Sequence, residues 1–306
     1  MKIVFGTDLS EEALAGARWA FSYARKLREK KIDVDLDVVH VTMPTRMRLD
    51  AGHASFEDPD YRHRLEQAIE DWLGDTVEPD LDYDIVFAEG SPVRELDEWA
   101  RATSADLLVV GMSGMGTFAR MMVGSTAHKL AQRPPCDLAL VHRERPFPEE
   151  KPRLMAAIDL LETSEDVLHS AARMAGVLGS TLHVVHVIMP PRPIGLPNGL
   201  VGISLSGNEL ADMEKNAARD MENWLEGQVD LLKGLEVHRE VLVGFPTRQL
   251  IEYADENAID AMFVGTVGRS ALDNFMLGSV ASGVVRHMPC TVVLSPPKNG
   301  RRNNES

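Results

Sequence analysis

Glycines recur at one spacing in two stretches of the chain, each following a short apolar run and preceding a helix-like segment. The spacing is a glycine, two residues, a glycine, nine residues, and then a glycine followed by a serine. These residues are Gly111, Gly114, Gly124 and Ser125 in the first stretch, and Gly265, Gly268, Gly278 and Ser279 in the second. Glycine lets backbone N–H groups approach an anion, and a helix N-terminus attracts negative charge. The spacing therefore predicts phosphate sites, with structural turns before helices as the alternative.

The two stretches belong to a repeat that covers the whole chain. Ser10 and Gly90 recur 154 residues later as Ser164 and Gly244, and the two cysteines, Cys136 and Cys290, share this offset. Asp8 recurs as Asp159, at a shorter offset that locates an insertion. Self-similarity of this kind sets the domain organisation before any single motif. The predicted units are domains at 1–146 and 152–297, followed by a disordered tail at 298–306.

Strand-like and helix-like runs alternate in each half, which favours a parallel sheet with helices on both faces. We expect two tandem doubly wound α/β domains, each with a five-stranded sheet in the order 3-2-1-4-5. The expected strands are Lys2–Thr7, Val34–Val41, Tyr83–Phe87, Leu107–Val110 and Leu138–His142, and runs near Leu154, Leu182, Val237, Ala261 and Thr291. Ligands bind such sheets at the carboxyl ends of the strands where the order reverses. Asp8 and Gly111 are expected to face each other there.

Composition narrows the classes of partner. The 306 residues are 44% hydrophobic and carry a net charge of −15, which argues against binding nucleic acid or anionic lipid. No run approaches the ~20 apolar residues of a membrane helix, and the chain opens directly on a strand-like run, so we expect a cytoplasmic protein. A bound nucleotide would need local donors and Mg²⁺. The two cysteines are expected to be buried hydrophobes rather than a disulfide or metal pair.

At the repeated glycines the sequence resembles the universal stress protein family, in its nucleotide-binding branch and in a tandem form that covers nearly the whole chain. The resemblance implies that the first two glycines of each stretch lie under the ribose and phosphates, and that the last glycine and its serine hold the phosphates. It also implies an aspartate near the ribose and a valine whose backbone meets adenine. With flanking residues, the predicted first site is Asp8, Val41, Gly111, Met112, Gly114, Gly124, Ser125 and Thr126. The predicted second site is Asp159, Val187, Gly265, Thr266, Gly268, Gly278, Ser279 and Val280.

Several roles stay open at this point. Asp8 is compatible with a helix cap as well as a ribose contact. Asp159 is separated from Ser164 by five positions, whereas Asp8 reaches Ser10 in two, so the first site matches the family pattern better. His40 and His186 are expected to pack within the domains. The sequence assigns no role to the loops at 43–60 and 189–208.

No lysine follows either glycine stretch as in P-loop enzymes, and no Ser-His-Asp or Cys-His spacing indicates a nucleophile. We therefore predict no catalytic residue and no protein metal ligand. The expected function is a stress-response protein that binds ATP or a related adenine nucleotide, with Mg²⁺, as a sensor or regulatory module. A slow ATPase or nucleotidyl-transfer enzyme and a nucleotide-free interaction module are the alternatives. The resemblance also implies an internal pseudo-dimer through the last strands, with a homodimer as a further option and the protein partner unknown.

Overall fold

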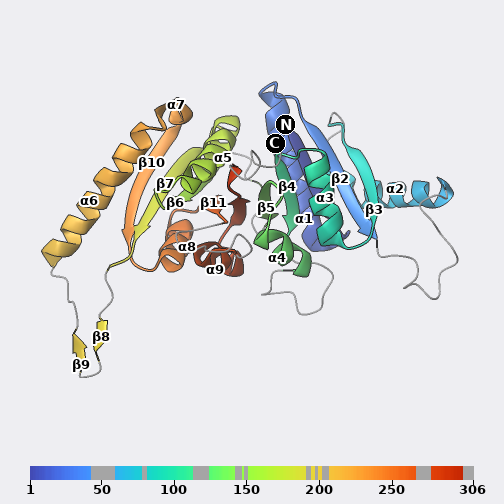
Figure 1. Cartoon of the computed structure of the whole chain (residues 1–306). Coiled ribbons are helices and arrows are strands. Elements are labelled where there is room, and N and C mark those ends of the chain that lie inside the picture. Colours follow the sequence, from blue (N-terminus) through green and yellow to red (C-terminus); the bar gives the residue numbers. More distant parts are fainter. Residues whose placement is uncertain are drawn as a thin grey trace, which may run out of the picture.

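A computed structural model describes residues 1–42, 59–77, 81–112, 124–141, 147, 151–190, 194–196, 199–201, 207–266 and 277–298. Ten strands form one sheet across the chain, and helices cover it on both sides (Figure 1). The strand order is β10-β7-β6-β11-β12-β5-β4-β1-β2-β3. A separate two-stranded hairpin, β8 (Ile194–Leu196) and β9 (Gly199–Val201), lies in the second half.

In the first half, strands and helices alternate as expected, with strand ends shifted by one or two residues. Ser10 caps the first helix, its Oγ accepting from the Ala13 N–H at 3.1 Å, and two glutamates occupy the first turn. The elements are β1 (Lys2–Thr7), α1 (Glu11–Glu29), β2 (Asp35–Thr42), α2 (Pro59–Leu73), a 3₁₀ turn (Gly74–Thr76), β3 (Asp84–Glu89), α3 (Pro92–Ala102), β4 (Leu107–Gly111), α4 (Ser125–Gln132) and β5 (Asp137–Val141).

The second half repeats this order. Its elements are β6 (Arg153–Ile158), α5 (Thr163–Leu178), β7 (Thr181–Ile188), the β8–β9 hairpin, α6 (Gly207–Glu226), α7 (Val229–Leu232), β10 (Glu236–Val243), α8 (Pro246–Glu256), β11 (Ala261–Gly265), α9 (Ser279–His287) and β12 (Thr291–Ser295). The predicted strand order 3-2-1-4-5 is confirmed, as β3-β2-β1-β4-β5 and as β10-β7-β6-β11-β12. The hairpin, within the predicted loop 189–208, was not expected from the sequence.

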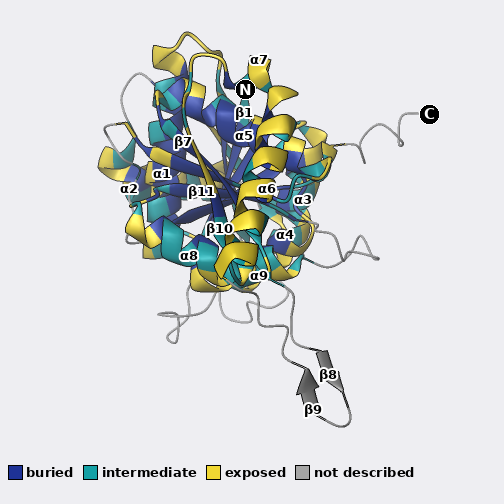
Figure 2. Ribbon diagram, turned by 90° about the vertical axis from the view of Figure 1, so that its left-hand side faces the viewer, coloured by how far each residue is buried: buried dark blue, intermediate teal, exposed yellow. Residues whose placement is uncertain are grey.

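Two apolar layers sandwich the sheet, and each layer runs through both halves. In Figure 2 the buried residues lie mainly in the strands, and exposed residues lie on the outside of the helices. Alternate residues of a strand face opposite layers, so Ile3 and Phe5 pack under α1 while Val4 packs under α3. Helices α1, α2, α5 and α6 cover one face, and α3, α4, α8 and α9 cover the other. Cys136 and Cys290 are free and buried in the second layer, as predicted.

The two halves meet where β5 pairs with β12, which are antiparallel, whereas the other neighbours in the large sheet are parallel. The register pairs Leu138 with Leu294, Ala139 with Val293, and Leu140 with Val292. This confirms the predicted internal pseudo-dimer. We use the word seam for this strand pair together with α1 and α5, which flank it on one face.

One side of the seam is charged. Arg173 of α5 donates from Nη1 to Asp106 Oδ1 at 3.3 Å, and its Nη2 lies 3.7 Å from Asp137 Oδ2. Asp137 is 5% exposed, and burial raises the pKa of its carboxyl. These contacts tie the second half to the first through a partly buried ion pair.

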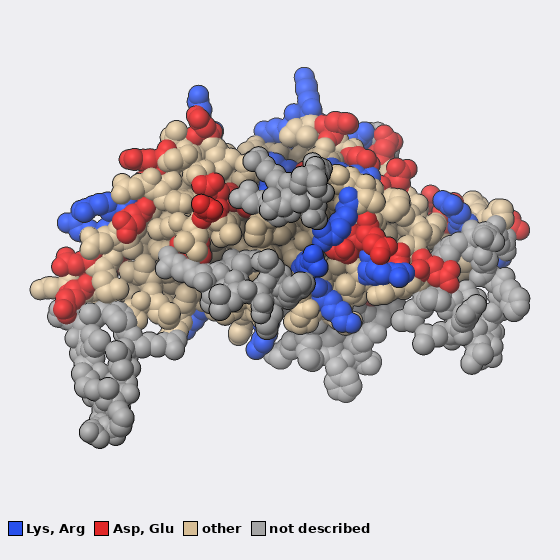
Figure 3. All heavy atoms as spheres, in the orientation of Figure 1, with Lys and Arg blue, Asp and Glu red and all other residues tan. Residues whose placement is uncertain are grey.

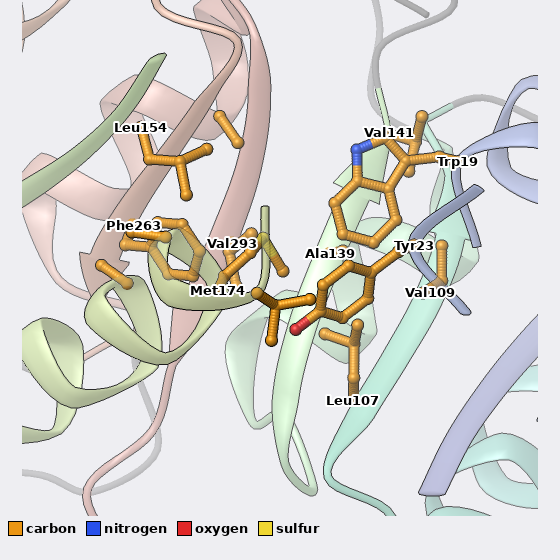
Figure 4. Packing of buried hydrophobic residues seen from close by; sticks show 14 of the residues in the cluster. Trp19, Tyr23, Leu107, Val109, Ala139, Val141, Leu154, Met174, Phe263 and Val293 are labelled. Carbon is orange, nitrogen blue, oxygen red and sulfur yellow. The ribbon is translucent and has the colours of Figure 1, made fainter. Parts of the chain in front are cut away.

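The other side of the seam is aromatic. Trp19 of α1 occupies the position that matches Arg173 at the 154-residue offset. Its ring packs edge-on against Phe147, with centroids 5.5 Å apart, and lies 5.6 Å from the ring of Tyr23. In Figure 4, Tyr23 points from α1 toward Met174 of α5, with Ala139 close by. The two sides of the internal pseudo-dimer therefore differ in chemistry.

Candidate functional site

The strand order reverses at the pair β1 and β4, and again at the equivalent pair β6 and β11. Strand β1 has β2 on one side and β4 on the other, and its last pair with β4 joins Gly6 to Val110. Beyond this pair the chain turns away into α1 on one side and the glycine loop on the other. A crevice at the carboxyl ends of the strands is the usual ligand position in this fold. Asp8 follows β1 and Gly111 ends β4, so both lie at the carboxyl ends of these neighbouring strands.

The first turn of α1 lies directly on Gly111. A Cβ atom added at Gly111 would come within 2.8 Å of the Glu12 carbonyl oxygen and 3.1 Å of Ala13 Cα. Gly16 of the same helix is also close, because its added Cβ would lie 3.3 Å from the Gly111 nitrogen. Helix and strand end can approach this closely only because glycine has no side chain. These contacts fix how closely the start of α1 lies against the end of β4.

A backbone hydrogen bond joins the described ends of each glycine loop, by which we mean residues 111–124 and 265–278. Gly124 N–H donates to the Met112 carbonyl at 2.6 Å, and Gly278 N–H donates to the Thr266 carbonyl at 2.8 Å. Each loop therefore returns to the point where it left the sheet, and a helix begins there. Sequence reasoning did not find this bond, because the spacing alone leaves the path of the loop open.

Helices α4 and α9 begin at this bond with glycine as the N-cap. Gly124 has φ −58° and ψ 151°, Gly278 has φ −55° and ψ 152°, and among the residues that the structure describes no side chain caps either helix. The first N–H groups of a helix have no partner within it and favour an anion. Ser125 and Ser279 are exposed at these starts, while Thr126 and Val280 are half-buried. Each site thus presents N–H donors and, in the serine, a hydroxyl.

Val41 and Val187 lie near the carboxyl ends of β2 and β7, the strands next to β1 and β6. Each valine is the last residue but one of its strand, a correction of one position from the predicted strand end. Gly90 N–H donates to the Thr42 carbonyl and Gly244 N–H to the Ile188 carbonyl, both at 2.9 Å. Carbonyls of successive residues point to opposite neighbours in a parallel sheet.

The Val41 carbonyl is therefore directed toward β1, one residue beyond the last β1–β2 pair, Thr7 with His40. By the same alternation, the Val187 carbonyl is directed toward β6, one residue beyond the pair of Ile158 with His186. A carbonyl in this position can accept a hydrogen bond from an exocyclic amino group such as that of adenine.

Two histidines contact backbone carbonyls at the ends of β1 and β6. His40 Nδ1 lies 3.0 Å from the Thr7 carbonyl oxygen, and His186 Nδ1 lies 2.9 Å from that of Ile158. Both histidines are packed against their own domain, as expected. Asp8 is exposed, and its Oδ1 accepts from the Ser10 N–H at 3.1 Å, so it belongs to the turn before α1 as well as to the crevice.

Of the predicted residues, the described ones lie at or near the carboxyl ends of the strands or at the starts of the helices that follow. In the first half they are Asp8, Val41, Gly111, Met112, Gly124, Ser125 and Thr126, and in the second Asp159, Val187, Gly265, Thr266, Gly278, Ser279 and Val280. Gly114 and Gly268 lie outside the described residues, as do most of the tail and most of the loops at 43–60 and 189–208. The end of the first of these loops is a correction, because α2 already begins at Pro59.

A second group of chemically active side chains lies at the opposite, amino-terminal ends of the strands. Asp35, Asp37 and Asp84 bring carboxylate oxygens within 4.8 Å of one another. Lys2 Nζ lies 2.8 Å from Asp35 Oδ1 and 2.7 Å from Asp37 Oδ2, so one ammonium offsets part of the negative charge of this group. Trp99 Nε1 donates to Asp37 Oδ2 at 2.7 Å. Lys2 and Trp99 thus hold Asp37 within the fold.

The second half has imidazoles at the equivalent place. His183 Nδ1 lies 2.8 Å from the Tyr253 hydroxyl, and its ring stacks on that of His238 with centroids 5.0 Å apart. At repeat positions, His183, His238 and Tyr253 stand where the first half has Asp37, Asp84 and Trp99. Burial lowers the pKa of His183, with His238 and Arg153 adding to the shift. This pair, like the acidic cluster, lies away from the crevices.

The surface agrees with an acidic protein. On the face in Figure 3, Lys and Arg lie among Asp and Glu instead of forming a broad basic patch. Within the described ranges, every helix is too short or too polar to cross a membrane.

Comparisons with known proteins match nearly the whole chain. A family model, that of the Universal stress protein family, matches residues 1–142 and 152–296. A universal stress protein of Mycolicibacterium smegmatis is 27% identical over 312 residues, covering 97% of both chains. The crystal structure of a universal stress protein from Archaeoglobus fulgidus shares the fold at a TM-score of 0.65 and 18% identity, covering 97% of this chain and 98% of that one.

Other solved universal stress proteins align with about half of the chain. One is in complex with cAMP and covers 48% of this chain at a TM-score of 0.32, and an Archaeoglobus fulgidus protein in complex with dAMP covers 47% at 0.33. The family match is twofold, once in each half. The chain belongs to the universal stress protein family, in a tandem two-domain form.

Proposed function

We propose that the protein binds ATP or a related adenine nucleotide, with Mg²⁺, in the crevice of each domain and acts as a stress-response sensor or regulatory module. The observation that carries this proposal is the closed glycine loop. The bonds from Gly124 to Met112 and from Gly278 to Thr266 bring an uncapped helix start beside the strand end where the sheet order reverses. A phosphate group fits such a start because both the free N–H groups and the helix dipole favour an anion.

The ribose and the adenine are assigned to the other residues at these strand ends. Asp8 lies on the β1 side of the crevice, where a ribose hydroxyl can donate to its carboxylate. The Val41 carbonyl faces the same gap one strand further along, where it can accept from the adenine amino group. Asp8 and the first-turn residues Glu11 and Glu12 make this wall acidic, so Mg²⁺ would offset their repulsion of the phosphates.

We expect the nucleotide to be held and not rapidly consumed. Phosphoryl transfer uses a phosphate-clamping lysine or arginine and a group that activates the nucleophile. Near the described parts of the crevices we find His40 and His186, and each ring nitrogen named above contacts a backbone carbonyl of its own domain. Multiple-turnover release of phosphate from Mg·ATP well above that of a Gly124→Asp, Gly278→Asp double variant would contradict this expectation.

The direct test blocks each phosphate position with a negative charge. Gly124→Asp and Gly278→Asp keep a favourable N-cap residue, because Asp suits the extended N-cap conformation seen at both glycines. A carboxylate there competes with phosphate, and a repulsion of roughly 4 kcal/mol for charges 4 Å apart near a protein surface weakens binding at least tenfold. Titration calorimetry with Mg·ATP should show two sites in the parent protein and one in each variant.

A matched control is Gly207→Asp. Gly207 starts α6, the space around it is open, and in Figure 1 α6 covers the outer strands, away from α4 and α9. This change adds the same charge at a helix start and should leave Mg·ATP binding as it was. Mass spectrometry of small molecules released on denaturation identifies any nucleotide that copurifies. If the parent protein neither releases nor binds an adenine nucleotide, the proposal is wrong.

A further inference from the structure

We propose that β10 is an acid-sensitive edge of the sheet: protonation of the stacked pair His183 and His238 separates β10 from β7 while the rest of the sheet stays closed. β10 is the outermost strand of the second half, and among the described strands it pairs with β7. An edge strand can open locally, because the strands beyond its neighbour keep their own hydrogen bonds. This device lies away from the nucleotide crevices and does not depend on the proposed function.

The two histidines face each other across the strand pair. His238 of β10 is the register partner of His183 of β7, and their rings stack with centroids 5.0 Å and planes 17° apart. The next residue, Arg239, lies on the opposite face, 3.6 Å from Glu222 of α6. Imidazole gains its positive charge between pH 8 and 5. As the pH falls, two like charges therefore come to lie directly opposite each other, which destabilises a strand pair.

The surroundings of His183 disfavour its charged form. The residue is 7% exposed, and burial lowers the pKa of its imidazole, with His238 and Arg153 of β6 adding to the shift. Its Nδ1 lies 2.8 Å from the Tyr253 hydroxyl of α8. Because a hydroxyl can donate or accept, this contact is possible in both protonation states of the ring. Burial and the positive charges nearby therefore set the cost of protonation, and separation of β10 relieves it by admitting water.

The acidic groups on β10 offset only part of this cost. Glu236 Oε1 lies 3.7 Å from His238 Nε2, but Glu236 Oε2 lies 3.0 Å from Lys151 Nζ, so the carboxylate is shared with an ammonium. Glu240 acts on Tyr253 instead: burial raises the pKa of this hydroxyl, and Glu240 adds to the shift. Tyr253 therefore stays neutral as the histidines titrate.

The first half provides an internal reference at the other edge of the sheet. There β3 is the outermost strand, and Asp84 of β3 is the register partner of Asp37 of β2. Lys2 Nζ lies 2.7 Å from Asp37 Oδ2. A pair of carboxyl groups beside an ammonium gains no positive charge opposite another as the pH falls. The β2–β3 pair should therefore stay closed under conditions that open β10.

Hydrogen–deuterium exchange of the full-length protein at pH 7.5 and 5.0, corrected for the intrinsic exchange rate at each pH, tests the proposal. A histidine that is kept neutral in the closed state and has a pKa of about 6.5 in the open state shifts the opening equilibrium by up to about thirtyfold at pH 5.0. We expect the protection of β10 to fall at least about fivefold. The protection of β2, β3 and the central strands should change by less than about twofold.

Two glutamine variants assign the effect to the pair. His183→Gln removes the buried titratable ring and keeps a side chain that can bind the Tyr253 hydroxyl, so it should reduce the loss of protection at pH 5.0. His238→Gln should also reduce it, and its side chain is 55% exposed, so the fold should tolerate the change. His287→Gln is the matched control. His287 is an exposed residue of α9 with Nδ1 2.8 Å from the Gly283 carbonyl, so its replacement should leave the response of β10 as in the parent.

Equal protection of β10 at the two pH values overturns the inference. A loss of protection shared by all strands of the sheet also overturns it, because the protein would then unfold as a whole. The same holds if the response of β10 is as large in His238→Gln and in every folded His183→Gln sample as in the parent.

Discussion

Replacing Gly111 with alanine should damage both the stability of the first domain and its nucleotide site. The added Cβ would lie 2.8, 3.0 and 3.1 Å from backbone atoms of Glu12 and Ala13, whereas ordinary contacts begin at 3.4 Å. The shortfall of about 0.6 Å cannot be relieved by rotating a side chain, so α1 must move away from β4 by about that much. Overpacking of this kind costs roughly 1–3 kcal/mol of unfolding free energy.

The same displacement widens the crevice. Asp8 precedes α1 and Gly111 ends β4, so a shift between these elements moves Asp8, the proposed ribose contact, away from the start of the glycine loop. We expect Mg·ATP affinity to fall at least about tenfold at the first site, measured in the Gly278→Asp background, and to stay constant at the second site, measured in the Gly124→Asp background.

Gly176→Ala provides the control for the stability measurement. It is the same substitution within α5, where the added Cβ has Leu235 Cδ2 as its nearest neighbour at 3.8 Å. An alanine there should stabilise the helix by about 0.5–1 kcal/mol. Urea unfolding followed by circular dichroism measures both variants. If Gly111→Ala unfolds at the same urea concentration as the parent and binds Mg·ATP equally well, the packing of α1 on Gly111 does not set the crevice.

Three further changes test the ionisable groups away from the crevices. Trp99→Phe removes the donor to Asp37 Oδ2, a residue 2% exposed, and should cost about 1–3 kcal/mol in urea unfolding, with the partly buried Trp72→Phe as a comparison that costs less. Burial lowers the pKa of His183 below 6.5, so the folded state binds fewer protons than the unfolded state, and the free energy of unfolding should fall as the pH drops below about 6.5. His183→Gln should reduce this loss of stability in urea unfolding measured from pH 7.5 to 5. If the variant loses stability as steeply as the parent, other groups cause the loss. Burial raises the pKa of Asp137 above 3.8, so the stability that this carboxyl contributes is lost as the pH rises through its folded-state pKa. The stability of Asp137→Asn relative to the parent should therefore be greater at pH 8 than at pH 4.5. The same pH profile of stability for variant and parent would refute this expectation.

The architecture could be predicted because its signals are local and appear twice. Apolar runs of strand length and the glycine spacing each depend on neighbours in sequence, and the repeat indicated which of them belong together. The pairing of β5 with β12 followed from the family resemblance. The strand order then places Asp8 and Gly111 at the carboxyl ends of the neighbouring strands β1 and β4.

Features that join distant segments could not be predicted in this way. The bond from Gly124 to Met112 depends on the path of the intervening loop, and the group of Lys2, Asp37 and Trp99 draws its members from three elements. Ser164 is the clearest case, because its hydroxyl binds Asp159, whereas the hydroxyl of its repeat counterpart Ser10 caps α1. The sequence showed that the second turn is longer, but the hydroxyl could equally have capped α5, and only the geometry shows that it binds Asp159.

The seam between the halves has an evolutionary consequence. In a homodimer built on a two-fold axis, a mutation at the interface appears on both subunits, so a new charge or a new ring meets its own copy. Here the two sides are encoded separately, and Arg173 can face Asp106 and Asp137 while its counterpart Trp19 packs on Phe147. After fusion of two domains into one gene, a mutation changes a residue on one side of the interface only, so the two sides can diverge. The same independence extends to the two crevices, which are free to acquire different ligands.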